Sequence, residues 1–189
     1  MKIIQTKIKD LYVIQPEVYI DERGYFFESF NEKMFNQKFP KIKFCQDNES
    51  MSSFGVLRGL HFQLPPKAQT KLIRVIKGKV LDVAVDIRWG SPSFGKHFSI
   101  ELSEENKKQL LVPRGFAHGF VVLSDQAIFS YKVDNYYDKL SDSGIAFDDK
   151  TLGIDWRLKR YELKLSLKDT KQPLFMDAKY FKYSKNLYE

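Results

Sequence analysis

The stretch KLIRVIKGKVLDVAVDIR, residues 71–88, decides the fold class. Two runs that alternate polar and apolar residues flank Lys77-Gly78-Lys79, and such alternation is typical of β-strands. Gly78 can adopt the positive φ that a tight turn requires, because it has no Cβ. The stretch is therefore predicted to be a β-hairpin.

The two faces of the second run differ in character. One face is wholly apolar and consists of Leu81, Val83, Val85 and Ile87. The other face mixes charged and small apolar residues and consists of Val80, Asp82, Ala84, Asp86 and Arg88. Such a mixed face either meets solvent or lines a polar barrel lumen, and the pattern leaves both open.

Most of the remaining chain also reads as short strands. Residues 97–120 indicate a strand, a polar turn and a strand that ends at Pro113, and residues 127–137 indicate a further strand. A helical period appears only in 30–39 and around 148–153. The predicted fold is all-β: an antiparallel jelly-roll barrel with a few short helices.

The chain of 189 residues has no Pro/Gly/Ser-rich linker and no repeat, so residues 1–189 are expected to form one domain. The single cysteine, Cys45, excludes an internal disulfide and fits a reducing compartment. The first residues, MKIIQTKIKDLYVI, contain no apolar run of signal-peptide or membrane-span length. A cytoplasmic location without a membrane partner is expected.

The net charge of +7 raises the question of a nucleic-acid partner. Lysines outnumber arginines 24 to 7 and are scattered among acidic residues, whereas base recognition favours arginine. We therefore expect a solvated, lysine-rich surface rather than a nucleic-acid interface. The positive field would still help to collect an anionic small molecule.

Few of the usual catalytic signatures are present. Small metal-binding barrels often carry an H-x-H pair, but Gln63 stands two residues after His61, and His97 and His118 are isolated. A site of His61, His118 and a carboxylate is conceivable, yet no metal is predicted. Cys45 has no clear cationic neighbour, and no G-x-S-x-G elbow, P-loop or G-x-G-x-x-G motif occurs.

Proton transfer is the chemistry that remains. His61 follows Gly59, Lys71 begins the next strand, and Tyr131 stands among apolar residues. Each also has an ordinary structural explanation: a core histidine, a surface lysine and a core tyrosine. These residues alone leave the function undecided.

A series of motifs along the chain indicates a function. In order, they are DERGYFFESF (21–30), CQDNES (45–50), GVLRGLHFQLPPKAQTKLIRV (55–75), GKVLDVAVDIRWGSPSFGK (78–96), LSEENKKQLLVPRGFAHGF (102–120), YKVDNYY (131–137), LGIDW (152–156) and LSLKD (165–169). With these motifs and spacings, the chain from about residue 3 to about residue 175 resembles the dTDP-4-dehydrorhamnose 3,5-epimerase family. Residues 177–189 fit the pattern poorly and are expected to be a variable tail.

The resemblance implies a metal-free, cofactor-free, cupin-type jelly roll that works as a homodimer. It implies an isomerase that converts dTDP-4-dehydro-6-deoxy-D-glucose to dTDP-4-dehydro-L-rhamnose, in the route to dTDP-L-rhamnose and cell-surface polysaccharide. By family match, His61 is the base, Asp169 orients it, Lys71 stabilises the enolate oxygen and Tyr131 is the opposing acid.

The resemblance also implies ten positions that bind the substrate. These are Arg23, Phe26, Glu28, Gln46, Asn48, Arg58, His118, Tyr137, Asp142 and Lys168, and the family often has glutamate at Asp142. Arginine and lysine suit the diphosphate, and Tyr137 matches the position that stacks on thymine. Arg58 and His61 would point to opposite faces of a regular strand, so a kink or bulge at Gly59 is expected.

Two alternatives remain at this point. Relatives that epimerise only C3 or only C5 keep much the same dyad and tyrosine. A non-catalytic cupin that only binds a sugar nucleotide would be expected to lack His61 or Asp169, and both are present.

Overall fold

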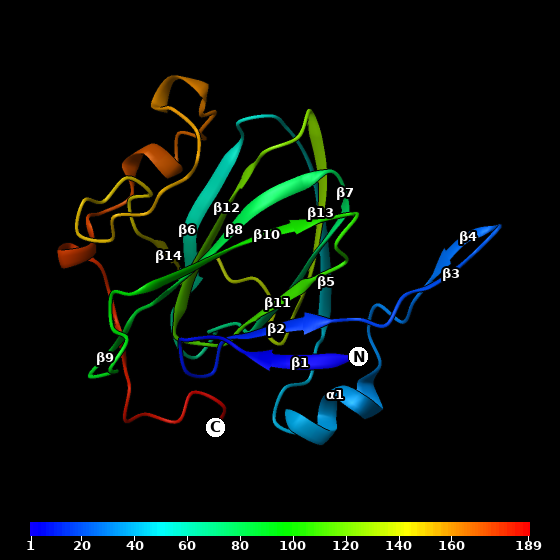
Figure 1. Ribbon diagram of the computed structural model, residues 1–189. Coiled ribbons are helices and arrows are strands. Elements are labelled where there is room, and N and C mark those ends of the chain that lie inside the picture. The colour runs from blue at the N-terminus through cyan, green and yellow to red at the C-terminus, as the bar shows by residue number, and fades with distance from the viewer.

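The computed structural model describes residues 1–189, and two antiparallel sheets packed face to face form the body of the molecule (Figure 1). In spatial order, the six-stranded sheet consists of β1 (Lys2–Gln5), β2 (Tyr12–Gln15), β11 (Gln109–Val112), β7 (Lys71–Lys77), β13 (Gln126–Val133) and β5 (Gln46–Ser53). The five-stranded sheet consists of β10 (His97–Ser103), β8 (Lys79–Asp86), β12 (Phe116–Val122), β6 (Leu57–Gln63) and β14 (Asp142–Gly144). The predicted all-β antiparallel architecture is confirmed.

Smaller elements surround this body. They are the pair β3 (Tyr19–Asp21) and β4 (Gly24–Phe26), the pair β9 (Arg88–Trp89) and β15 (Phe181–Lys182), the helix α1 (Glu32–Lys38), and the 3₁₀ turns η1 (Arg160–Glu162), η2 (Asp169–Lys171) and η3 (Phe175–Asp177). No helix has the length and apolar character needed to cross a bilayer.

The predicted hairpin at Gly78 is wrong. The strands on either side of it, β7 and β8, belong to different sheets, so Gly78 is a corner where the chain crosses from one sheet to the other. Its φ is +75°, and a Cβ there would lie 2.0 Å from the carbonyl oxygen of Gln126. The positive φ was predicted correctly, but strand pairing depends on distant partners that local alternation does not reveal.

The mixed face of β8 lies inside the barrel. Val80 and Ala84 pack in the cluster between the two sheets, and Asp82, Asp86 and Arg88 are buried as well. The polar-lumen interpretation is therefore correct, and the solvent-facing one is wrong. A sandwich with charged groups inside it offers a place for polar chemistry.

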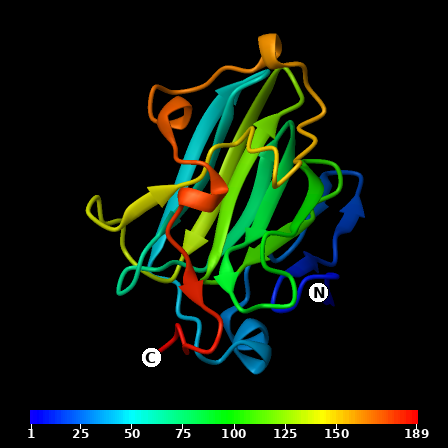
Figure 2. The same cartoon turned by 90° about the vertical axis from the view of Figure 1, so that its left-hand side faces the viewer.

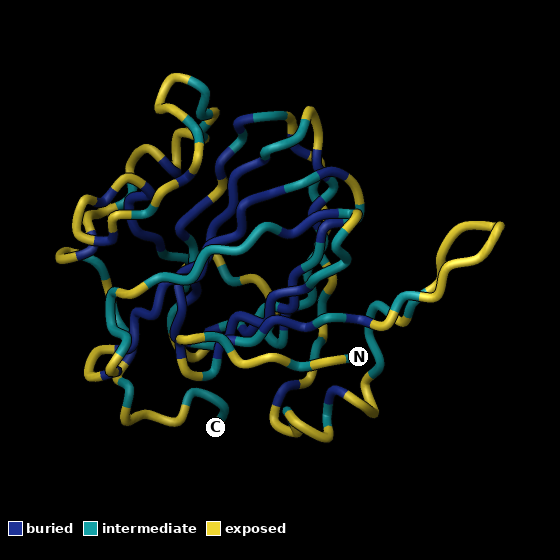
Figure 3. The backbone as a smooth tube through the Cα atoms, viewed as in Figure 1, coloured by how far each residue is buried: buried dark blue, intermediate teal, exposed yellow.

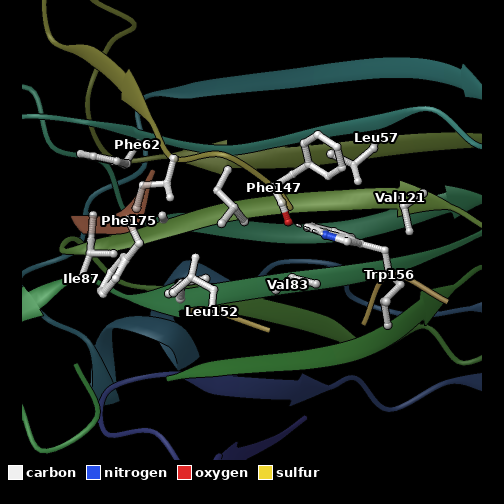
Figure 4. Packing of buried hydrophobic residues seen from close by; sticks show 14 of the residues in the cluster. Leu57, Phe62, Val83, Ile87, Val121, Phe147, Leu152, Trp156 and Phe175 are labelled. Carbon is white, nitrogen blue, oxygen red and sulfur yellow. Dashed lines mark hydrogen bonds between the residues drawn. The ribbon is translucent and has the colours of Figure 1, made fainter. Parts of the chain in front are cut away.

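The apolar face of β8 packs against residues 145–187, which cover the outside of the five-stranded sheet (Figure 2). In this cluster Trp156 donates a hydrogen bond to the carbonyl oxygen of Phe147, 2.8 Å away (Figure 4). The helix expected at 148–153 is absent. The buried Asp149 carboxylate accepts backbone N–H groups of Thr151 and Phe175, both at 2.7 Å, and fixes turns there instead.

The one α-helix lies where the helical period predicted it, although it is shorter. The Asn31 side chain accepts the backbone N–H of Met34 at 3.1 Å and so caps α1 at its N-terminus. Phe35 is fully buried under the six-stranded sheet beside Ile42 and Leu111.

The β3–β4 hairpin, residues 19–26, is an arm that projects away from the body (Figures 1 and 3). All of its strand residues are exposed. A two-stranded hairpin without a core of its own is marginally stable in water. The arm therefore needs a surface to pack against.

Candidate active site

His61 and Asp169 lie 108 residues apart in sequence and meet side by side in the structure. His61 Nε2 is 2.6 Å from Asp169 Oδ1, and Asp169 also accepts the hydroxyl of Ser166 at 2.6 Å. Burial alone would raise the pKa of Asp169, but the hydrogen bonds from His61, Ser166 and the Gly59 amide leave its pKa below the usual value. An ionised, buried carboxylate therefore holds the imidazole in one orientation.

A bulge brings Arg58 and His61 to the same side of β6. Along β12, His118 pairs with His61 and Phe120 pairs with Arg58, so β6 has one residue more than its partner between these pairs. Gly59 lies in this segment with φ of +139°, and a Cβ there would be 2.5 Å from Gly119 Cα. The predicted irregularity at Gly59 is confirmed.

These side chains line a cavity of about 290 Å³ between the two sheets. Of the residues predicted for the site, six line it: Asn48, Arg58, His61, Lys71, His118 and Tyr131. They come from the strands β5, β6, β7, β12 and β13. The cavity joins a potential base, a potential acid and two cations, Arg58 and Lys71, as an enolate reaction requires.

Lys71 is the cation whose protonation is most altered. Burial lowers the pKa of its ammonium to about 8, although the Asp82 and Asp142 charges oppose this fall. Near neutral pH the group is therefore charged, but it loses its proton at a much lower pH than an exposed lysine.

The pKa of Tyr131 shifts in the opposite direction, upward. Burial raises the pKa of its phenol, and the nearby Arg58 charge only partly opposes this. The phenol is therefore protonated at neutral pH and can donate a proton.

His118 forms a second histidine–carboxylate pair at the back of the cavity. Its Nε2 lies 3.0 Å from both carboxylate oxygens of Asp82, a residue of the mixed face of β8. Burial lowers the pKa of His118, although Asp82 opposes the shift. Phe129 stacks on Phe120 with a centroid distance of 3.9 Å, so the cavity also has an aromatic wall.

Four further predicted binding residues lie beside the cavity, connected by side-chain contacts. Tyr137 donates its hydroxyl to Asp142 at 3.2 Å, and Lys168 forms an ion pair with the same carboxylate. Gln46 donates to Asn48 at 2.7 Å and accepts the backbone N–H of Tyr137 at 3.4 Å. The network links the exposed Tyr137 ring to the cavity through Asn48.

The other three predicted binding residues, Arg23, Phe26 and Glu28, do not reach this cavity. Arg23 forms an ion pair with Asp21 in the arm, Phe26 is 67% exposed, and Glu28 accepts the side-chain amide of Asn31. The structure thus separates them from the other predicted residues of the same chain.

Sequence reasoning assigned no role to several residues of the site. Glu49, Ser50, Phe120 and Phe129 line the cavity, and Ser166 supports Asp169. Phe129 lies two residues before Tyr131 in the strand predicted at 127–137, so strand alternation puts both on one face and is a usable signal. Ser166 had none, because its role depends on a short turn that leads into η2.

The sequence model of the dTDP-4-dehydrorhamnose 3,5-epimerase family matches residues 5–177. A dTDP-4-dehydrorhamnose 3,5-epimerase of Shigella flexneri is 52% identical over 182 residues, which cover 96% of this chain and 99% of the relative. The chain belongs to this family. No group of three or more His, Cys, Asp or Glu side chains is placed to hold a metal ion.

Solved structures of family members agree with the fold. The dTDP-6-deoxy-D-glucose-3,5-epimerase of Legionella pneumophila, in complex with dTDP-4-keto-L-rhamnose, superposes with a TM-score of 0.93 at 45% identity, covering 97% of this chain and 99% of that one. A 3'-monoepimerase of Streptomyces bikiniensis, in complex with dTDP-quinovose, has a TM-score of 0.86 at 29% identity, covering 92% and 87%. The predicted cupin-type jelly roll is confirmed.

Proposed function

We propose that the chain epimerises C3 and C5 of dTDP-4-dehydro-6-deoxy-D-glucose and yields dTDP-4-dehydro-L-rhamnose. The observation that carries this is the convergence of His61, Lys71 and Tyr131 on one cavity, with Asp169 behind His61. The similarity favours the double epimerase, because the Shigella flexneri enzyme is 52% identical and the 3'-monoepimerase 29%.

The C4 ketone of the substrate acidifies the hydrogens on both adjacent ring carbons. His61 removes one of them, and the electron pair moves to the ketone oxygen as an enolate. The Lys71 ammonium stabilises this oxygen, and Tyr131 returns a proton to the opposite face of the same carbon. The ionised Asp169 carboxylate stabilises the imidazolium that forms.

The nucleotide would lie across the mouth of the cavity. Arg58 and Lys168 supply positive charge for the diphosphate, and the exposed ring of Tyr137 offers a face for thymine. Gln46, Asn48, His118 and Asp142 are proposed to complete this surface with hydrogen bonds.

We propose that the working form is a homodimer in which the arm of each subunit reaches the other's cavity. The arm exposes four large apolar side chains, Tyr19, Ile20, Tyr25 and Phe26, of which Ile20 is 81% exposed. Apolar exposure of this kind is typical of an interface. The arm would bring Arg23 and Phe26, and the segment just after it Glu28, to a site that their own chain does not let them reach.

A cytoplasmic location is proposed on one observation. Cys45 is free and exposed, and an unpaired thiol is expected to persist in a reducing compartment.

Solvent exchange tests the reaction. The protein is incubated with dTDP-4-dehydro-6-deoxy-D-glucose in D₂O, and deuterium at C3 and C5 is read by NMR. Label at both carbons is expected; label at one would show a single-site epimerase, and no label would leave a sugar-nucleotide binder.

The base assignment is tested with His61→Ala. Loss of a general base typically costs about 10²–10⁴-fold, so exchange should fall by that factor. Binding of thymidine diphosphate, measured by calorimetry, should survive because the nucleotide contacts lie elsewhere. Exchange at the wild-type rate in this variant would contradict the role of His61.

A further inference from the structure

A second, larger cavity of about 590 Å³ lies at the base of the molecule and shares no lining residue with the cavity of His61. Its walls are the loop after β1, the loop after α1, the end of β11 and the C-terminal tail. Figures 1 and 2 both show the C-terminus beside α1 at this end. The proposed epimerase reaction makes no use of this space.

The lining of this cavity is strongly cationic. Six basic residues contribute to it: Lys9, Lys38, Lys41, Arg88, Arg114 and Lys185. Asp10 is the one acidic residue among the sixteen that line it. An excess of one sign of charge in a concave, partly apolar surface raises the local concentration of counter-ions.

Two of these cations are rigid parts of the floor. Arg88 is 6% exposed; it is held by Asp86 at 2.9 Å and by Asp10 at 2.7 Å, and its guanidinium lies 5.1 Å from the Tyr183 ring centroid. Arg114 donates to Asp134 at 3.2 Å and to the Leu187 carbonyl at 2.7 Å. Each guanidinium keeps at least one N–H without a protein acceptor.

Carboxylates therefore compensate the two arginines, and the lysines at the edge supply the excess charge. Lys41 and Lys185 are both exposed and form no ion pair within the chain. They come from different walls, one from the loop after α1 and the other from the tail. A ligand that reaches both must carry more than one negative charge, or one charge spread over several oxygens.

The tail that builds this wall lies beyond the region matched by the family, which ends at residue 177. It is nevertheless fixed to the body. The Tyr188 hydroxyl lies 2.8 Å from the Thr70 hydroxyl and accepts the backbone N–H of Arg114 at 3.3 Å. The cavity is therefore a formed feature, although the tail was expected to be merely variable.

We propose that this basic cavity is a second ligand site, distinct from the site of epimerisation, and that it binds an oligophosphate anion. The ligands that fit have in common a chain of two or three phosphates, which would contact the lysines of both walls and the arginine N–H groups beneath them. Such a chain is present in inorganic polyphosphates and in nucleotides, which would add a base to the tyrosine-lined part of the cavity.

Calorimetry with inorganic tripolyphosphate, dTTP and UTP tests the proposal on full-length Arg58→Ala/Lys168→Ala, in which the epimerisation site has lost the cations proposed to hold the diphosphate. Thymidine diphosphate is not added, because its own two phosphates would compete for the basic cavity. One tripolyphosphate per chain is expected, with affinity that falls as salt rises. Tighter binding of both nucleotides would identify a nucleotide site, and equal affinity would identify a phosphate site. Absence of binding to all three would overturn the proposal.

The location is tested with Lys41→Glu/Lys185→Glu, which should weaken tripolyphosphate binding by at least about tenfold because two charge-assisted contacts become repulsive. The matched control is Lys77→Glu/Lys150→Glu, which reverses two exposed lysines outside the cavity and should bind as the wild type does. Lys41→Arg/Lys185→Arg should also retain binding. Equal weakening by the test pair and the control pair would show only a general charge effect and would contradict the site.

Discussion

At the scale of single residues, the catalytic proposal depends on opposite pKa shifts in one cavity. Burial moves Lys71 and Tyr131 in opposite directions, because it favours the neutral form of each: the amine in one case and the phenol in the other. The two shifts make separate predictions, since the lysine must be charged to stabilise an enolate and the tyrosine must be protonated to act as an acid.

Tyr131→Phe should separate exchange from inversion. His61 can still remove a proton and return a deuteron to the same face, but the opposite face has lost its acid. In D₂O we expect deuterium in the substrate with retained configuration, while inversion slows by about 10²–10⁴-fold. Tyr136→Phe, a neighbouring exposed tyrosine outside the cavity, is the control. Wild-type inversion by Tyr131→Phe would exclude this phenol as the acid.

The pKa of Lys71 predicts the pH dependence. The value of kcat/KM should fall as pH rises through about 8, because the free enzyme then loses its ammonium. Unfolding caused by deprotonation of Lys71 would not explain this fall in kcat/KM. Its folded-state pKa lies below the unfolded value of 10.5, so its contribution to stability increases from pH 8 to 10.5. Lys71→Met should lower activity and abolish this fall; a retained fall would assign it to another group.

At the scale of elements, local pattern predicted the strands but not which strand each one joins. Alternation in β8 separated its apolar face from its mixed face and left open whether the mixed face meets solvent or the lumen. The strands β7 and β8 were wrongly paired, because the corner at Gly78 resembles a hairpin turn in sequence. The contact between His61 and Asp169 likewise could not be predicted from local pattern. Only the resemblance joined them, since no local signal connects residues 108 apart that meet through a closed fold.

Gly59 allows a prediction about the bulge in β6. In Gly59→Ala the new Cβ would meet Gly119 Cα at 2.5 Å in addition to the cost of φ at +139°. We expect a loss of more than about 2 kcal/mol in the free energy of unfolding, measured by urea titration. Gly24→Ala also has a positive φ, +125°, but meets nothing within 4 Å, so it should cost only about 1 kcal/mol. Equal losses would mean that the close approach of β6 to β12 contributes little.

At the scale of the whole molecule, the site proposed here is incomplete in one chain. The barrel supplies the cavity, the base and the acid, while Arg23 and Phe26 lie on the projecting arm and Glu28 follows the arm beside Asn31. Sequence could identify all of these residues by resemblance, but it could not show that the arm leaves its own barrel. That property depends on the path of residues 15–31, in which no residue of the hairpin is buried.

Complementation between two inactive variants tests whether the arm acts on the partner subunit. If Arg23 works in trans, a mixed dimer of Arg23→Ala and His61→Ala has one doubly altered site and one intact site. Random reassortment makes about half of the dimers mixed, so about a quarter of wild-type activity should return. Mixing His61→Ala with Asp169→Asn is the control and should restore nothing, because these residues meet within one chain and every site then lacks one of them. An arm that crosses to the partner's cavity must leave one site intact in each mixed dimer of Arg23→Ala and His61→Ala. If this mixture is as inactive as the mixture of His61→Ala and Asp169→Asn, Arg23 therefore acts only within its own subunit or not at all.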